Sequence, residues 1–376
     1  MKNNNSSNKL IKLFLLLTTG FMAVSPLDIP VLNYVFRIPS LLLICFIVLK
    51  YYPRAKRKYV LPLTGIVFTI LINFTYVNSL INFDLFLAIV SVLSFLFLII
   101  ISPLIKVDDR MLSFIYKNSL CCAVILIVYA VSPLSHWDGI RNNIYMTFGY
   151  ENSNYAGIVA FLVSSLLMVS VNTEIKKQLI VSWFFEFVLL YLIYETGSRG
   201  ALVAAVVVPL YMVFLRNYKL NRLFLYVLCS IPFFFVPFYM NLFKSNVYSS
   251  MDFMGKSVMS GRQWVYESYL SRLHDDTQVW FGNLCENGFQ NAHNGPLAIY
   301  VSVGIIGTIA FFYILINRIR LSNQFARSFN ARLAVIVILA TFLNTCGEAS
   351  LFLGGFPGIT FLFFFFVISS SSYVRN

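Results

Sequence analysis

Long apolar runs separated by short polar segments recur along the chain from Leu10 to Ser369. A membrane-spanning helix needs about 20 mostly apolar residues, because the bilayer core offers no water to its backbone. About twelve segments have this character, with approximate limits 10–27, 34–52, 58–77, 79–104, 112–134, 154–171, 178–195, 198–216, 222–243, 296–317, 331–348 and 350–371. Of the 376 residues, 59% are hydrophobic and only 11% are charged, which excludes a soluble globular enzyme and a disordered chain. We expect an all-α polytopic membrane protein that forms one integral membrane domain over residues 1–376.

The basic residues are distributed unevenly among the connections between these predicted spans. If the N-terminus lies in the cytoplasm, most of the 28 Lys and Arg residues fall in cytoplasmic connections or at cytoplasmic span ends. Positive residues are enriched on that side of membrane proteins. The net charge of +13 is therefore read as a topology signal, with the lipid bilayer as partner and no nucleic acid. This pattern predicts an even number of spans with both termini in the cytoplasm.

The opposite, extracytoplasmic side is predicted to hold the long connections, 135–153 and 244–295. The three histidines of the chain lie in these connections or at their ends, namely His136, His274 and His293. Long connections on a scaffold of short ones tend to carry function. The large loop 244–295 is too short for a core of its own, so we expect it to pack on the helix bundle.

One part of the large loop, residues 261–273, has the pattern of an amphipathic helix. Val265, Tyr269 and Leu273 fall four apart on one face, whereas Gln263 and Glu267 fall on the opposite face. This pattern predicts a helix that lies near the membrane surface.

Two arginines are predicted to begin helices on this extracytoplasmic side. Arg199 follows a turn that Gly197 allows, and Arg262 follows Gly261. A cation at a helix N-terminus opposes the helix dipole, whereas a bound anion there is favoured by the dipole and by the guanidinium. Arg199 and Arg262 are thus candidate anion ligands. The alternatives are an Arg199 that contacts lipid phosphate and an Arg262 that pairs with an acidic residue or a lipid headgroup.

Polar residues at two further span entrances are candidate ligands for a sugar or a proton. His293 can exchange a proton near neutral pH, and Asn294 can orient it or bind a sugar hydroxyl. Asn152 and Asn154, preceded by Arg141, lead into another span, where they either cap the helix or bind a polyhydroxylated ligand. Each of these residues also has a purely structural interpretation.

Two acidic residues lie inside predicted spans. Asp84 and Glu186 could form a proton or ion path, as buried membrane acids often do, or they could pair with Lys117 or a polar neighbour. His274-Asp275-Asp276 is a poor metal site, because three adjacent residues do not converge on one ion. We expect no metal site.

In their order along the chain, four of these segments resemble the superfamily of O-antigen ligases and polysaccharide polymerases. The resembling residues are Ser198-Arg199-Gly200, Gly261-Arg262, His293-Asn294 and Gly304-Ile305-Ile306-Gly307. Residues 148–154 resemble the Asn-Pro-Asn segment of that superfamily, with Ser153 in place of the proline. The resemblance covers roughly residues 141–310, and the N-terminal third is similar only in consisting of hydrophobic spans.

The resemblance implies a GT-C-like integral-membrane glycosyltransferase of the bacterial inner membrane. Its donor would be a glycan on undecaprenyl diphosphate, and its acceptor another lipid-linked glycan. Arg199 and Arg262, with Arg141 as a third cation, would stabilise the departing diphosphate. His293 would act as the base, and Asn152, Asn154 and Asn294 would bind substrate. Such an inverting transfer requires no nucleotide, metal or other cofactor.

Three activities are compatible with this expectation. A polymerase of O-antigen or capsule would transfer the growing glycan to the terminal sugar of another lipid-linked repeat unit, together with a co-polymerase that sets chain length. A ligase would transfer the polymer to lipid A core. A flippase or transporter of lipid-linked oligosaccharide would instead use Asp84, Lys117 and Glu186. We favour the polymerase, because the segment 149–154 resembles polymerases and no feature recognises lipid A core.

Overall fold

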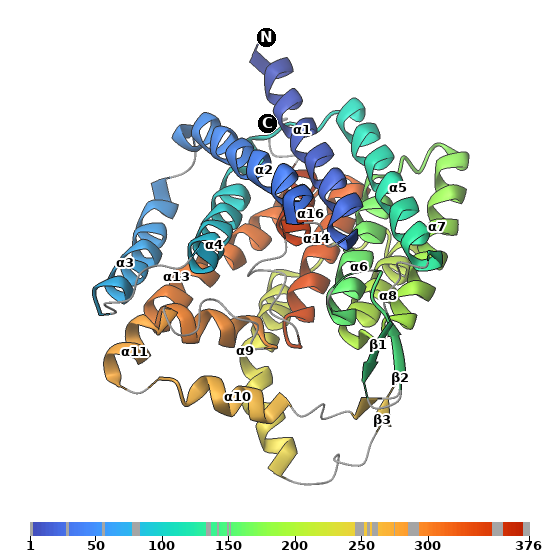
Figure 1. Ribbon diagram of the computed structural model, residues 1–376. Coiled ribbons are helices and arrows are strands. Elements are labelled where there is room, and N and C mark those ends of the chain that lie inside the picture. The colour runs from blue at the N-terminus through green and yellow to red at the C-terminus, as the bar shows by residue number, and fades with distance from the viewer. Residues whose placement is uncertain are drawn as a thin grey trace.

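The structure, a computed structural model, describes residues 3–27, 30–54, 57–76, 83–132, 137–140, 143–148, 150, 152–244, 252–253, 256–257, 262–273, 275–284, 293–347 and 356–370. Helices dominate this part of the chain, and two short antiparallel hairpins accompany them. Both hairpins and α10 lie at the end of the bundle opposite to the start of α1 and the end of α16 (Figure 1).

The α-helices are α1 (Asn3–Val24), α2 (Pro30–Tyr51), α3 (Val60–Tyr76), α4 (Phe83–Ile101), α5 (Asp109–Val131), α6 (Ser153–Ser170), α7 (Lys176–Glu195), α8 (Arg199–Phe214), α9 (Arg222–Lys244), α10 (Arg262–Leu270), α11 (Asp276–Phe281), α13 (Gly295–Phe325), α14 (Phe329–Asn344) and α16 (Phe356–Ser369). Single-turn 3₁₀ helices are η1 (Ser25–Leu27), η2 (Tyr52–Arg54), η3 (Arg57–Tyr59) and η4 (Ser102–Leu104). The hairpins pair β1 (Trp137–Ile140) with β2 (Asn143–Met146) and β3 (Asp252–Phe253) with β4 (Lys256–Ser257).

Each of the predicted spans contains a helix in the structure. Eight helices of the described chain are long and apolar enough to cross a membrane, which indicates a multi-pass membrane protein. Four further segments are apolar but shorter, namely 88–104, 199–214, 329–344 and 357–369. The all-α polytopic class is therefore confirmed, and a count of twelve crossings stays a prediction.

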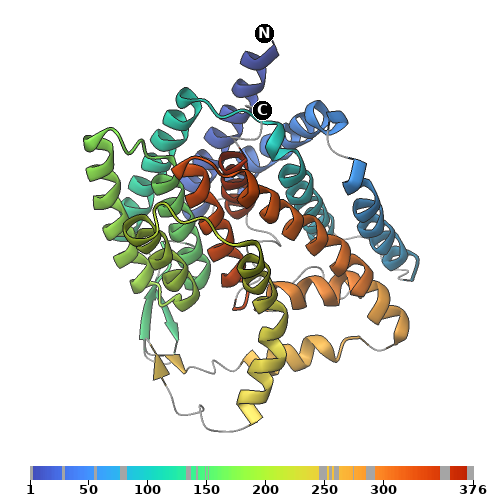
Figure 2. The ribbon, with the colours of Figure 1, turned by 180° about the vertical axis from the view of Figure 1, so that it is seen from behind.

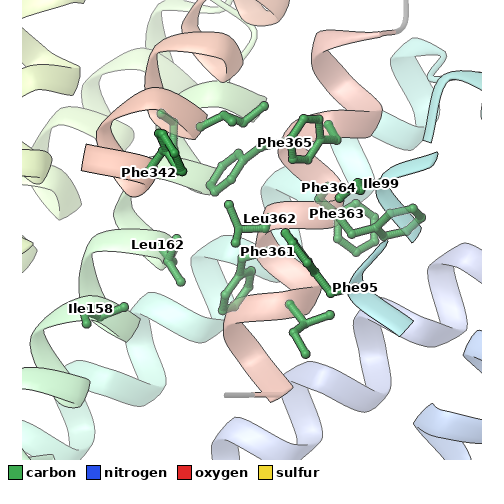
Figure 3. Packing of buried hydrophobic residues seen from close by; sticks show 14 of the residues in the cluster. Phe95, Ile99, Ile158, Leu162, Phe342, Phe361, Leu362, Phe363, Phe364 and Phe365 are labelled. Carbon is green, nitrogen blue, oxygen red and sulfur yellow. The ribbon is translucent and has the colours of Figure 1, made fainter. Parts of the chain in front are cut away.

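The core is built around α16, whose sequence is apolar on all faces. Its residues 361–368 are buried, and the helix contacts α14, α6, α4 and α1 (Figure 3). A helix that is hydrophobic all round is buried rather than amphipathic. Thr18 Oγ1 donates to Thr360 Oγ1 over 3.1 Å and joins α1 to the central helix. The remaining helices surround this centre, and α2, α3 and α7 lie at the periphery (Figures 1 and 2).

The described parts of the large loop pack against the bundle. α10 contacts α9 and α13, and α11 contacts α13 and α3. Asn73 on α3 anchors the end of α11 and the residues that follow it. Its Nδ2 donates to Phe281 O, and its Oδ1 accepts from Leu284 N, each over 2.7 Å.

A break divides α13 into two parts at Gly304, where φ is +64° and ψ is −170°. A Cβ at Gly304 would overlap the main chain of Trp280, and one at Gly282 would overlap that of Ser302. Glycine is therefore required at both positions, because the backbones touch and both residues have positive φ. The part of α13 before the break lies beside α11 and leads back to His293.

The predicted helix forms, and its burial agrees with the prediction at Tyr269 but not at Gln263. Gln263 is buried together with Tyr266 and Tyr269, whereas Leu270 is 40% exposed. Contact between Tyr266 and Tyr239 of α9 sets the rotation of α10, and this tertiary contact is absent from the local pattern.

Candidate functional site

The turn between α7 and α8 places Arg199 at the first position of α8. Gly197 adopts a φ of +62°, which the predicted tight turn requires. The turn packs closely on α6, since a Cβ at Gly157 would lie 2.5 Å from Ser198 Cβ and 2.7 Å from Thr196 Oγ1. The start of α6 and the start of α8 therefore meet at this end of the bundle.

The C-terminal turn of α14 contacts the starts of both α8 and α10. A Cβ at Gly200 would overlap Asn344 Oδ1, and a Cβ at Gly347 would lie 2.6 Å from Arg262 Nη1. Asn344 and Gly347 are separated by only two residues. The residue after Arg199 and the guanidinium of Arg262 therefore both lie against this short segment of the chain.

The two arginines also share a neighbour on α9. The hydroxyl of Tyr239 interacts electrostatically with the guanidinium groups of both Arg262 and Arg199. The Tyr239 side chain is buried, and its ring packs edge to face on Tyr266 with the centroids 5.5 Å apart. The structure therefore brings these two predicted site residues together.

His293 enters the same cluster through its backbone. Tyr266 Oη donates to the carbonyl of His293 over 3.4 Å. His293 has a φ of +52°, a conformation that costs energy for a residue with a Cβ and that is frequent at functional sites. Next to it, Gly295 N donates to Thr345 O over 2.8 Å and ties the start of α13 to the C-terminal turn of α14.

Asn294 has an extensive structural role. Its Oδ1 accepts from Leu297 N over 2.9 Å and caps α13, while its Nδ2 donates to Pro232 O and Cys346 O, each over 3.3 Å. The side chain is 1% exposed. These bonds hold the backbone next to His293, and an orienting role of Asn294 toward the imidazole stays a prediction. Direct binding of substrate by Asn294 stays a prediction.

The other predicted ligands have different outcomes. Asn152 caps α6 by accepting from Asn154 N over 2.7 Å, which supports the capping interpretation, and it is exposed. Asn154 is partly buried in the first turn of α6. Arg141 lies outside the described residues. Substrate binding by these three residues stays a prediction.

Two further polar residues of this site were not predicted from the sequence. Asn344 is 6% exposed, and neither Oδ1 nor Nδ2 has a hydrogen-bond partner in the part of the chain that the structure describes. Gln263 is 5% exposed, and its Oε1 also lacks a partner in that part. A buried amide without partners costs about 1–3 kcal/mol and is rare in native proteins. The one available signal was local, because both residues lie beside the proposed arginines or at the end of a span.

Glu186 lies apart from this cluster, on α7. Its side chain is fully buried beside the hydroxyl of Ser164 on α6, the kind of polar neighbour considered from the sequence, and neither carboxyl oxygen has a hydrogen bond of good geometry within the described residues. Lys117 is exposed, so the suggested pairing between Lys117 and Glu186 is wrong. The side chain of Asp84 lies outside the described residues.

The cluster combines two guanidinium groups, two buried amides, a buried phenol and a histidine at one end of a helical membrane protein. Guanidinium groups suit phosphate oxygens, and amides suit hydroxyl or phosphate groups. Comparison with protein-family models and with curated proteins gave no match.

Proposed function

We propose that the protein is a glycosyltransferase that polymerises surface polysaccharide from lipid-linked repeat units. The observation that carries this proposal is that the charges of Arg262 and Arg199 both act on the buried hydroxyl of Tyr239, whose ring packs on Tyr266 beside the turn that holds His293. Two guanidinium groups at the membrane edge are well suited to stabilise the negative charge of a departing diphosphate. The resemblance in the four sequence segments adds the class of substrate, a glycan on undecaprenyl diphosphate.

In this mechanism, the guanidinium groups of Arg199 and Arg262 bind the diphosphate of the donor. The imidazole of His293 accepts the proton of the attacking sugar hydroxyl. The hydroxyl oxygen forms a bond to the anomeric carbon as the bond from that carbon to the diphosphate oxygen breaks, and the configuration inverts. The diphosphate departs on its lipid, and the proton passes from His293 to solvent. Asn344 and Gln263 supply hydrogen bonds to the bound donor.

The proposed setting is the bacterial inner membrane, with both termini in the cytoplasm and the site on the extracytoplasmic face. The uneven distribution of basic residues supports this orientation. A co-polymerase that sets chain length is a further proposed partner. A ligase that uses lipid A core as acceptor would share the same diphosphate site.

The test is the glycan profile of a deletion strain that carries variants of the gene. Arg199→Gln, Arg262→Gln and His293→Ala should each slow polymer formation about 10²–10³-fold and leave single repeats at the cell surface. Arg272→Gln is the matched control, because this arginine stacks on Tyr269 at the far end of α10, with 4.5 Å from guanidinium to ring centroid. Normal polymer from Arg199→Gln and His293→Ala strains would refute the proposal.

A transporter of lipid-linked sugar is a second candidate, which the buried carboxyl of Glu186 favours. Glu186→Gln should leave polymer length unchanged if the protein is a polymerase. If Glu186→Gln abolishes surface repeats while the arginine and histidine variants are silent, the transporter replaces the polymerase. Long lipid-linked polymer without core attachment in the deletion strain would instead identify a ligase.

A further inference from the structure

A groove of about 730 Å³ lies between α9 and α13. Its lining is mainly apolar and includes Phe233, Ile309, Phe312 and Ile316. The rings of Phe233 and Phe312 pack edge to face within this lining, with their centroids 4.7 Å apart. The side chain of Ile309 is 66% exposed. An open apolar groove along two spans lies within reach of lipid chains.

One end of the groove is cationic. Arg320 lies in its lining, and Arg320 Nη2 donates to Asn317 Oδ1 over 3.0 Å. Arg222 on α9 reaches the same end, because its guanidinium lies 5.7 Å from the ring centroid of Tyr226 and its Nη2 donates to Tyr226 Oη over 3.5 Å. Lys219 donates to the carbonyl of Gln324 over 2.8 Å and adds a third positive charge beside them.

No acidic residue occurs in α9 or α13, so neither helix offers a carboxylate to these arginines. We propose that the groove binds a glycerophospholipid with an anionic headgroup. Its phosphate lies between Arg222 and Arg320, and one acyl chain follows the apolar lining toward Phe233. Arginine suits this role, since its donors match phosphate oxygens and a cation near the headgroup region attracts anionic lipid.

The position of the charges favours a phospholipid over the polyprenyl chain of a lipid-linked glycan. Arg320 lies near the C-terminal end of α13, whereas His293 precedes its N-terminal end. A polyprenyl diphosphate bound near His293 would place its apolar tail, and not its head, beside Arg222 and Arg320. This site is therefore independent of the proposed transfer reaction.

The experiment is native mass spectrometry of the full chain in detergent, titrated with phosphatidylglycerol or with phosphatidylcholine. We expect the wild type to retain phosphatidylglycerol preferentially. Arg222→Gln and Arg320→Gln should each weaken its binding about fivefold, which corresponds to about 1 kcal/mol per charge near the membrane surface. The control is the double variant Lys176→Gln/Lys177→Gln, which removes two exposed charges from the start of α7 and should have no effect.

Three results would overturn the proposal. The wild type could bind both lipids equally, the Lys176→Gln/Lys177→Gln control could lose as much lipid as the arginine variants, or the groove could retain a polyprenyl chain whose binding ignores both arginines. If the arginine variants do not fold, the wild-type protein still tests the proposal. Concentrated salt should release phosphatidylglycerol from it, because salt screens the attraction between the arginines and the lipid phosphate. Retention that is unchanged by salt would also overturn the proposal.

Discussion

Asn344 and Asn294 offer a matched pair of buried asparagines at the same end of the bundle, and their replacement by leucine should have opposite effects on stability. The Asn294 amide makes three hydrogen bonds, of which one caps α13. Loss of the cap costs about 1 kcal/mol, and loss of each other bond about 1 kcal/mol. We therefore expect Asn294→Leu to lower the free energy of unfolding by about 2–3 kcal/mol.

Asn344→Leu removes an amide that has no hydrogen-bond partner among the residues that the structure describes. Burial of such an amide costs about 1–3 kcal/mol. The branched methyl groups of leucine crowd Gly200, which offsets about 1 kcal/mol of that gain. The free energy of unfolding should thus stay equal or rise by up to about 2 kcal/mol, while polymer formation falls because a hydrogen bond to the bound donor is lost.

Two measurements test this pair. Unfolding of both variants is followed in the same detergent, by heat or by titration with a denaturing detergent, and polymer is measured in the complemented deletion strain. If Asn344→Leu unfolds as easily as Asn294→Leu, Asn344 has a structural role and its amide is satisfied in solution. If Asn344→Leu is stable and makes normal polymer, the amide does not bind the donor.

Three further perturbations concern the same end of the bundle. Gly200→Ala forces a methyl group into the amide of α14 and should cost about 1–3 kcal/mol in unfolding and most of the activity, whereas Gly65→Ala, whose new Cβ would have its nearest neighbour at 3.7 Å, should be tolerated in the same assays. Gly347→Ala should displace the flexible guanidinium of Arg262, so transfer should slow with little change in unfolding temperature. Burial raises the pKa of the Cys346 thiol to about 12. Alkylation at pH 8 should therefore modify this thiol only after unfolding, and stability should fall as pH rises above about 8.5, where the unfolded thiol loses its proton first. Cys346→Ala should remove this part of the alkaline loss.

The sequence predicted those features of the fold that depend on local pattern. Apolar runs gave the position of every predicted helix, and the Gly197 turn before Arg199 follows from a glycine that can adopt positive φ. The positions of Arg199 and Arg262 at helix starts also follow from the local pattern, and the structure has both at the first residue of a helix. These signals act over a few residues and need no knowledge of which helices are neighbours.

Packing between distant helices was not predictable from the same patterns. The amphipathic pattern placed Gln263 on the exposed face, whereas contact of Tyr266 with Tyr239 turns it inward. The charge pattern predicts that Arg318 lies at a cytoplasmic span end, and it carries no sign that this arginine is 4% exposed and donates from Nε to Ile99 O over 3.0 Å. For Asn344 the sequence offered only its position near the end of a span, because its burial depends on the close approach of α14 to α8.

The arrangement of helix ends favours binding of an anion at the candidate site. The N-terminal ends of α8, α10 and α13 meet around the last turn of α14, and α8 and α10 each begin with an arginine. Each N-terminus carries a partial positive charge, so three of them beside two guanidinium groups repel one another. The partial negative charge at the C-terminal end of α14 offsets only a fraction of this repulsion. A bound diphosphate would neutralise the remainder, so binding of the donor would relieve this repulsion. The stabilisation would be strongest when the leaving group carries its full negative charge.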